Sequence, residues 1–136
     1  MARILALDYG EKRTGIAVTD ELQLIASGLT TVETKNLFDF LNSYITTESV
    51  ERIVIGEPKQ KDGSPSSIEN DIQSVLAKLK KKFPNMAIER QDERFTSKIA
   101  VQSMIASGLK KKKRRDKALV DEISATLILQ AYLERN

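Results

Sequence analysis

The chain of 136 residues has the size of one ordinary domain, and its 40% hydrophobic and 30% charged residues are typical of a folded globular protein. No apolar run reaches the roughly 18 residues of a membrane helix, and the N-terminus lacks a signal-peptide pattern, so we expect one cytoplasmic domain over residues 1–136. The net charge is +3, and the absence of Cys and His excludes thiolate and imidazole chemistry, so hydrolytic chemistry must rest on carboxylates.

Apolar periodicity and turn residues predict strands first and then alternating helices and strands. The predicted strands, in chain order, are 3–9, 14–20, 23–32, 52–56 and 86–90. The predicted helices are 35–48, one between Ser66 and Pro84, 96–108, and 117–134. Ser66 and Glu69 have the spacing of a capping box at the start of the second helix. This order predicts an α/β, RNase H-like fold: a mixed five-stranded sheet with one antiparallel strand, flanked by helices.

The first chemical signal is an acidic residue at the end of the first predicted strand, in the segment DYGEKRTG at residues 8–15. Alternation places Asp8 on the same face as Ile4 and Ala6, where a carboxylate is costly unless it is paired or binds a cation. Asp8 therefore suits a metal ligand, although a turn-capping Asp in a hairpin has the same pattern. The fragment also occurs in actin-like ATPases, but those need a second domain to close over a nucleotide.

Two further acidic segments flank the predicted helices of the second half. Asp92, Glu93 and Arg94 lie between a strand and a helix N-terminus, where acids are also favoured simply by the helix dipole. On the last helix, the spacing directs Asp121 toward the apolar side and Glu122 toward water. An acid on an apolar helix face is hard to explain by solvation, so Asp121 is a functional candidate.

Acids from the first strand, the last strand and the final helix can converge at one edge of such a sheet. Carboxylates gathered in this way are the ligands that Mg²⁺ takes together with water and phosphate oxygens, and a pair of ions can activate water and stabilise the leaving oxygen of a phosphodiester. Without a cation the gathered carboxylates repel one another, so we expect Asp121→Asn to leave the metal-free protein at least as stable.

The sequence resembles the YqgF family, which comprises Holliday-junction-resolvase-like proteins regarded as nucleases of the 16S ribosomal RNA precursor. The resemblance covers nearly the whole chain, through DYGEKRTGIAVTD at 8–20, RIVIGEPKQKDGS at 52–64, DERFTS at 92–97 and KALVDEISATLILQAYL at 117–133. It implies an RNase H-like nuclease with Asp8, Glu93 and Asp121 as catalytic acids. Glu57 departs from the apolar residue expected there and is either a fourth acid or a loop carboxylate, and Ser124 replaces an expected alanine.

The resulting hypothesis is a metal-dependent phosphodiesterase in which Asp8, Glu93 and Asp121 hold Mg²⁺ or Mn²⁺, as a two-metal site. A nucleic-acid partner is indicated because the segment KKKKRRDK at 110–117 is strongly basic, whereas the remainder of the chain has a net charge of −3. The same run also fits a solvated basic loop. The predicted phosphate-binding residues are Lys12, Arg13, Arg94, Lys110, Lys111, Lys112, Lys113, Arg114, Arg115 and Lys117.

Other functions remain open at the level of sequence. They are a resolvase-like nuclease of branched DNA, a noncatalytic RNA-binding factor of ribosome assembly or transcription, and an actin-like nucleotide-binding regulator. The sequence does not decide between RNA and DNA as the substrate, between a monomer and a homodimer, or whether Asp92 joins the acidic site.

Overall fold

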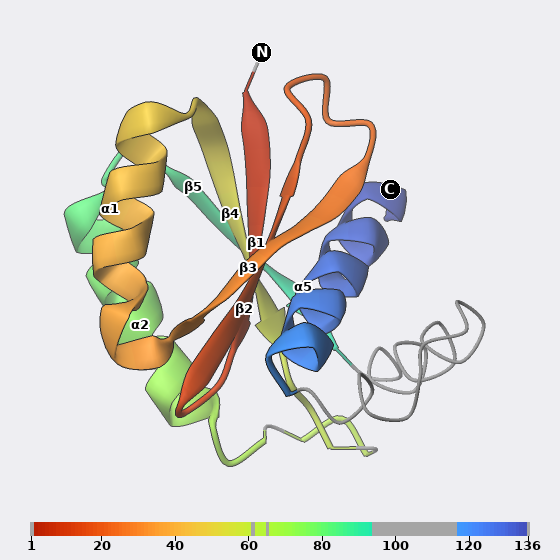
Figure 1. The fold of residues 1–136 in the computed structure, drawn as a ribbon. Coiled ribbons are helices and arrows are strands. Elements are labelled where there is room, and N and C mark those ends of the chain that lie inside the picture. Colours follow the sequence, from red (N-terminus) through yellow and green to blue (C-terminus); the bar gives the residue numbers. More distant parts are fainter. Residues whose placement is uncertain (1, 61, 65, 94–116, 136) are drawn as a thin grey trace.

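The computed structural model describes residues 2–60, 62–64, 66–93 and 117–135 (Figure 1). Within these ranges the strands are β1 (Arg3–Tyr9), β2 (Arg13–Thr19), β3 (Ala26–Glu33), β4 (Val50–Glu57) and β5 (Ala87–Asp92). The helices are the short 3₁₀ helix η1 (Thr34–Asn36), α1 (Leu37–Thr47), α2 (Glu69–Lys82) and α5 (Lys117–Glu134). No helix in the described part of the chain is long and apolar enough to cross a membrane. The predicted helix over residues 96–108 lies outside the described residues.

The strands form one mixed sheet in the order β3-β2-β1-β4-β5. Strand β1 pairs with β2 in antiparallel fashion and with β4 in parallel, and β4 pairs with β5 in parallel. Because β3 is antiparallel to β2, strand β2 alone runs against the other four. The prediction of a five-stranded sheet with one antiparallel strand is confirmed.

Helices cover both faces of the sheet, α1 and α2 on one face and α5 on the other (Figure 1). Alternation along β1 sends Leu5 and Leu7 toward α1 and α2, and Ile4 and Ala6 toward α5. The core under α1 and α2 also contains Ile16, Val18, Leu37, Leu41, Ile53, Ile55, Ile72, Val75, Leu76 and Leu79. The core under α5 also contains Ala17, Val54, Ala125, Ile128, Leu129 and Tyr132. Asp8 therefore continues the face of β1 that α5 covers.

Strand β3 begins three residues later than predicted because Asp20 organises a loop before it. The carboxylate of Asp20 accepts hydrogen bonds from the backbone N–H groups of Leu24 and Ile25, both at 2.8 Å. Gln23 within this loop has a positive φ of 59°, which is incompatible with an extended strand.

The predicted capping box at the start of α2 is wrong. Helix α2 has Ile68 as its N-cap, without a side-chain capping bond. The Glu69 carboxylate instead accepts two hydrogen bonds from the guanidinium of Arg90 on β5, both at 2.9 Å. A bidentate, largely buried ion pair is stronger than a cap at an exposed helix end. The Glu69 side chain therefore binds Arg90 instead of capping the helix.

Candidate active site

Asp8 lies near the carboxyl end of β1, on the face that α5 covers, and its side chain is mostly removed from solvent. Burial is the largest influence on this carboxyl group, and the negative charge of Asp121 adds to it, so the pKa of Asp8 is raised to about 6. A carboxyl group held in this way gains from a cation or a proton beside it.

Glu93 is the partner that supplies such a proton in the metal-free protein. It follows β5 directly, and its backbone N–H donates to the carbonyl oxygen of Glu57 on β4 at 3.0 Å. Burial, together with the charge of Asp8 and a hydrogen bond to it, raises the pKa of Glu93 to about 8. Protonated Glu93 therefore donates to the Asp8 carboxylate, and the pair shares one proton at neutral pH.

Asp121 lies on the first turns of α5, where its charge acts on Asp8, but its side chain is bound elsewhere. Its carboxylate accepts a hydrogen bond from Nε of Arg13 at 2.9 Å, and both side chains are partly buried. The structure thus joins two of the three predicted acids directly and gives the third an arginine partner. No sequence pattern predicts this ion pair, since 108 positions separate its members.

The Arg13 contact reverses the expected effect of Asp121→Asn on the metal-free protein. The loss of the ion pair with Arg13 should outweigh the relief of repulsion by Asp8. The free energy of unfolding in EDTA should therefore fall by up to about 1 kcal/mol. Urea denaturation of both proteins measures this difference. Glu33→Gln is the matched control, since its ion pair with Lys35 is well exposed and should contribute nothing measurable. A more stable Asp121→Asn protein would show that repulsion by Asp8 dominates.

Glu57 and Asp92, the alternative acids, lie beside each other at the ends of β4 and β5. Alternation places both on the face that carries Ile55 and Arg90, which α2 covers, whereas Asp8 and Glu93 are on the α5 face. Lys59 contacts both carboxylates, at 3.4 Å to Glu57 and 3.7 Å to Asp92. Their charges are therefore balanced by a lysine on the other side of the sheet.

Glu122 does not project freely into water as the helix periodicity predicts. Its side chain is half-buried against Gly28 of β3, where a β-carbon would lie 2.5 Å from its Oε1 atom. The prediction failed because α5 packs on β2 and β3 as well as on β1, so its polar side also meets the sheet.

The predicted phosphate-binding residues are only partly described. Lys12 is exposed in the turn between β1 and β2, and Arg13 begins β2. Together with Glu11, Glu33 and Lys35 they line a hollow of about 490 Å³. Lys117 is the first residue of α5. Arg94 and the segment 110–115 lie outside the described residues.

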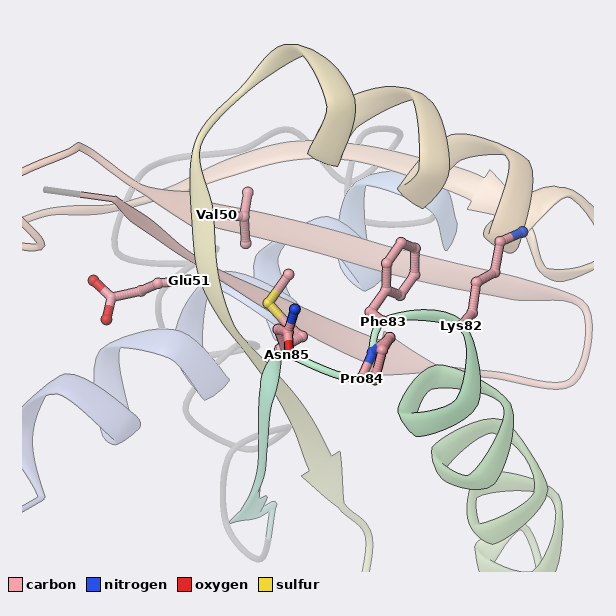
Figure 2. Close-up of a pocket in the computed structure, with 7 residues that line it drawn as sticks. Val50, Glu51, Lys82, Phe83, Pro84 and Asn85 are labelled. Atoms are coloured by element: carbon pink, nitrogen blue, oxygen red, sulfur yellow. The ribbon is translucent and has the colours of Figure 1, made fainter.

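A second hollow, of about 400 Å³, lies at the other end of the sheet (Figure 2). It is lined by Val50 and Glu51 at the start of β4 and by Lys82, Phe83, Pro84, Asn85 and Met86 between α2 and β5. Its lining has a single carboxylate, so it lacks the paired acids that distinguish the Asp8 end of the sheet.

The donor set around Asp8 partly fits a hard divalent cation. Asp8 and Glu93 offer two adjacent carboxylates that repel each other when both are charged, and Mg²⁺ characteristically takes one or two carboxylates plus water. Across residues 2–60, 62–64, 66–93 and 117–135, no three acidic side chains are grouped closely enough to hold a metal ion. A third ligand from Asp121 would require that side chain to leave Arg13.

Known proteins resemble this chain over its whole length. Proteins named "Putative pre-16S rRNA nuclease" are 68% identical in Christiangramia forsetii and 62% identical in Flavobacterium psychrophilum, and each alignment covers at least 98% of both chains. The fold resembles that of the Fowlpox virus resolvase solved with Holliday junction DNA, with a TM-score of 0.59, 16% identity and 97% of each chain covered. This likeness agrees with the predicted RNase H-like fold. The family model described as "RuvX: Holliday junction resolvase" matches residues 2–135, and the chain belongs to that family.

Proposed function

We propose that this chain is one cytoplasmic, metal-dependent nuclease domain that hydrolyses phosphodiester bonds in structured RNA, in the maturation of the 16S ribosomal RNA precursor. The observation that carries the proposal is the pair of partly buried acids, Asp8 and Glu93, at the carboxyl edge of the sheet. The names of the close relatives support the choice of substrate.

In this proposal Asp8, Glu93 and Asp121 hold one or two Mg²⁺ or Mn²⁺ ions. Such ions, when bound, lower the pKa of a water molecule and stabilise negative charge on the leaving oxygen. The chain's own part is to hold the carboxyl groups in place, and their raised pKa values mean that the bare site favours a proton or another positive ligand. Arg13, when it releases Asp121, is free to meet a phosphate oxygen of the substrate.

A noncatalytic RNA-binding role is the second candidate, and a specific observation argues against it. A protein that only binds a polyanion gains nothing from placing two partly buried acids beside one another near its basic turn. A resolvase-like nuclease of branched DNA remains a close variant of the proposal, because the fold likeness is to a resolvase. Both a monomer and a homodimer are compatible with the proposed nuclease function.

The test is incubation of the purified protein with structured precursor RNA and with four-way DNA junctions, in Mg²⁺, in Mn²⁺ and in EDTA. The proposal predicts RNA cleavage that requires the divalent ion and is absent from Asp8→Asn protein. Metal-dependent cleavage of the DNA junction alone would select the resolvase variant. Tight RNA binding without cleavage under any of these conditions would favour the noncatalytic role.

Replacing Lys110 to Arg115 with Gln should weaken nucleic-acid binding and flatten its salt dependence. Each lost phosphate contact should reduce the slope of log K against log salt by about 0.7–0.9, because fewer counterions are released. Fluorescence anisotropy at several salt concentrations, with two unrelated RNA sequences, measures both the slope and the discrimination. We expect discrimination to stay unchanged, since phosphate contacts carry little base information. An unaltered slope would mean that the segment is a solvated loop.

A further inference from the structure

The hydrogen-bonded acids come from strands that are not neighbours in the sheet. Asp8 is on β1 and Glu93 follows β5, and β4 lies between these two strands. Adjacent strands are about 4.8 Å apart, so the backbones that carry the acids are separated by about 9.5 Å. The two carboxyl groups therefore meet only because a side chain crosses the surface of β4.

Gly56 occupies the place on β4 over which this crossing occurs. It follows Ile55, the register partner of Leu7, so it lies beside Asp8, and it is itself the partner of Gln91 on β5. Alternation after Val54 directs the missing side chain of Gly56 toward α5, the face of both acids. A residue with a side chain here would stand between Asp8 and Glu93.

The space that a side chain would need at Gly56 is filled by Glu93. A β-carbon at Gly56 would lie 2.5 Å from Cδ, 2.7 Å from Oε2 and 2.8 Å from Cγ of Glu93. Carbon atoms in favourable contact are about 3.5–4.0 Å apart, so the Glu93 carboxyl group would have to move. The atoms concerned are at the end of a side chain with several rotatable bonds, so the displacement costs little stability.

Backbone conformation gives no other reason for glycine at this position. Among the described residues Gly63 is the glycine with a positive φ, so Gly56 has a backbone that alanine can adopt. A glycine inside a strand otherwise weakens it, and close approach of another group is the usual reason for one.

We propose that Gly56 is a positioning residue of the active site, whose lack of a side chain lets Glu93 reach across β4 to the Asp8 side. This inference rests on the proposed nuclease function. It adds to the acids a position that carries no chemical group and contributes only space. Gly56→Ala should therefore displace Glu93 without removing any charge from the site.

The experiment compares Gly56→Ala with Gly28→Ala, which makes the same kind of contact elsewhere. Gly28 is on β3, which is not adjacent to β1, the strand of Asp8. A β-carbon at Gly28 would lie 2.5 Å from the Oε1 atom of Glu122. We expect Gly56→Ala to lower kcat for metal-dependent cleavage by about 10- to 100-fold, the scale of a misplacement near 1 Å, with KM unchanged. Gly28→Ala should cleave like the wild type. Equal activity of Gly56→Ala and wild type would overturn the inference.

A double-mutant cycle shows whether Gly56 acts through Glu93. In a Glu93→Ala background the extra methyl group has space, so Gly56→Ala should cause no further loss of cleavage. Losses that multiply in the double variant would mean that Gly56 acts independently of Glu93, which would also overturn the inference. If Gly56→Ala alone loses stability and Glu93→Ala restores it, the two groups compete for one space and the inference is supported.

Failure of the proposed function is distinguishable from failure of this inference. If the wild type cleaves no substrate, crystal structures of wild-type and Gly56→Ala protein still report the position of the Glu93 carboxyl group. Separation of Glu93 from Asp8 in the variant alone supports the inference without any activity. An unchanged contact between the two carboxyl groups contradicts it.

Discussion

Asp8→Asn and Glu93→Gln should each reduce metal-dependent cleavage by at least about 10²-fold, the scale on which loss of one preorganised electrostatic group acts. Both substitutions keep the size of the side chain and remove a negative charge that the proposed cation needs. Asp121→Asn should cause a loss of similar size if its carboxylate leaves Arg13 for the cation. Initial rates under substrate saturation, with single-turnover controls, measure the effect.

Substrate binding in EDTA should survive these changes, because we propose that basic side chains bind the phosphates, and these substitutions remove none of them. Glu122→Gln is the matched control, since Glu122 is next to Asp121 in sequence but packs against Gly28. Its activity should equal that of the wild type. A fully active Glu93→Gln protein would show that Glu93 is not a catalytic acid. Glu57 and Asp92 would then be the candidate acids, although they lie on the α2 face of the sheet.

In EDTA, the stability of the wild type relative to Glu93→Gln should fall as the pH rises from about 4.5 to about 8. The pKa of Glu93 is about 8 in the folded protein and has a reference value of 4.5, so the folded state binds more protons than the unfolded state across this range. The stability that protonated Glu93 contributes is therefore fully present below pH 4.5 and is lost as the pH rises through 8. The raised pKa is caused mainly by burial of Glu93 beside Asp8, and the resulting decrease in the free energy of unfolding is on the order of a few kcal/mol.

Glutamine at position 93 imitates protonated glutamate, because its amide can donate to the Asp8 carboxylate at any of these pH values. Melting temperatures of the two proteins should therefore be similar near pH 5 and diverge toward pH 8.5, with the variant higher. Mg²⁺ should raise the wild-type melting temperature more than that of the variant, since it binds the charged pair. A pH-independent difference between the two proteins would contradict the shared proton.

Much of the fold was predictable because its signals are local. Alternation along β1 identified the face of Asp8 from Ile4 and Ala6, since neighbouring side chains of a strand must point to opposite faces. Apolar periodicity likewise predicted helices where the structure has α1 and α2. The predicted ends of strands were less accurate where a side chain binds the backbone, as Asp20 does before β3.

Local patterns in the chain were enough to predict the strands, the sheet with one antiparallel strand, and carboxylates as the groups available for hydrolytic chemistry. Which acids contact one another depends on the folded arrangement of the strands and α5. Glu93 reaches Asp8 across Gly56, Asp121 pairs with Arg13, and Glu57 and Asp92 are held by Lys59 on the other face. The pattern placed Asp8, Glu93 and Asp121 near one sheet edge, but these individual contacts depend on side-chain packing between segments far apart in the chain, which the periodicity of each segment does not specify.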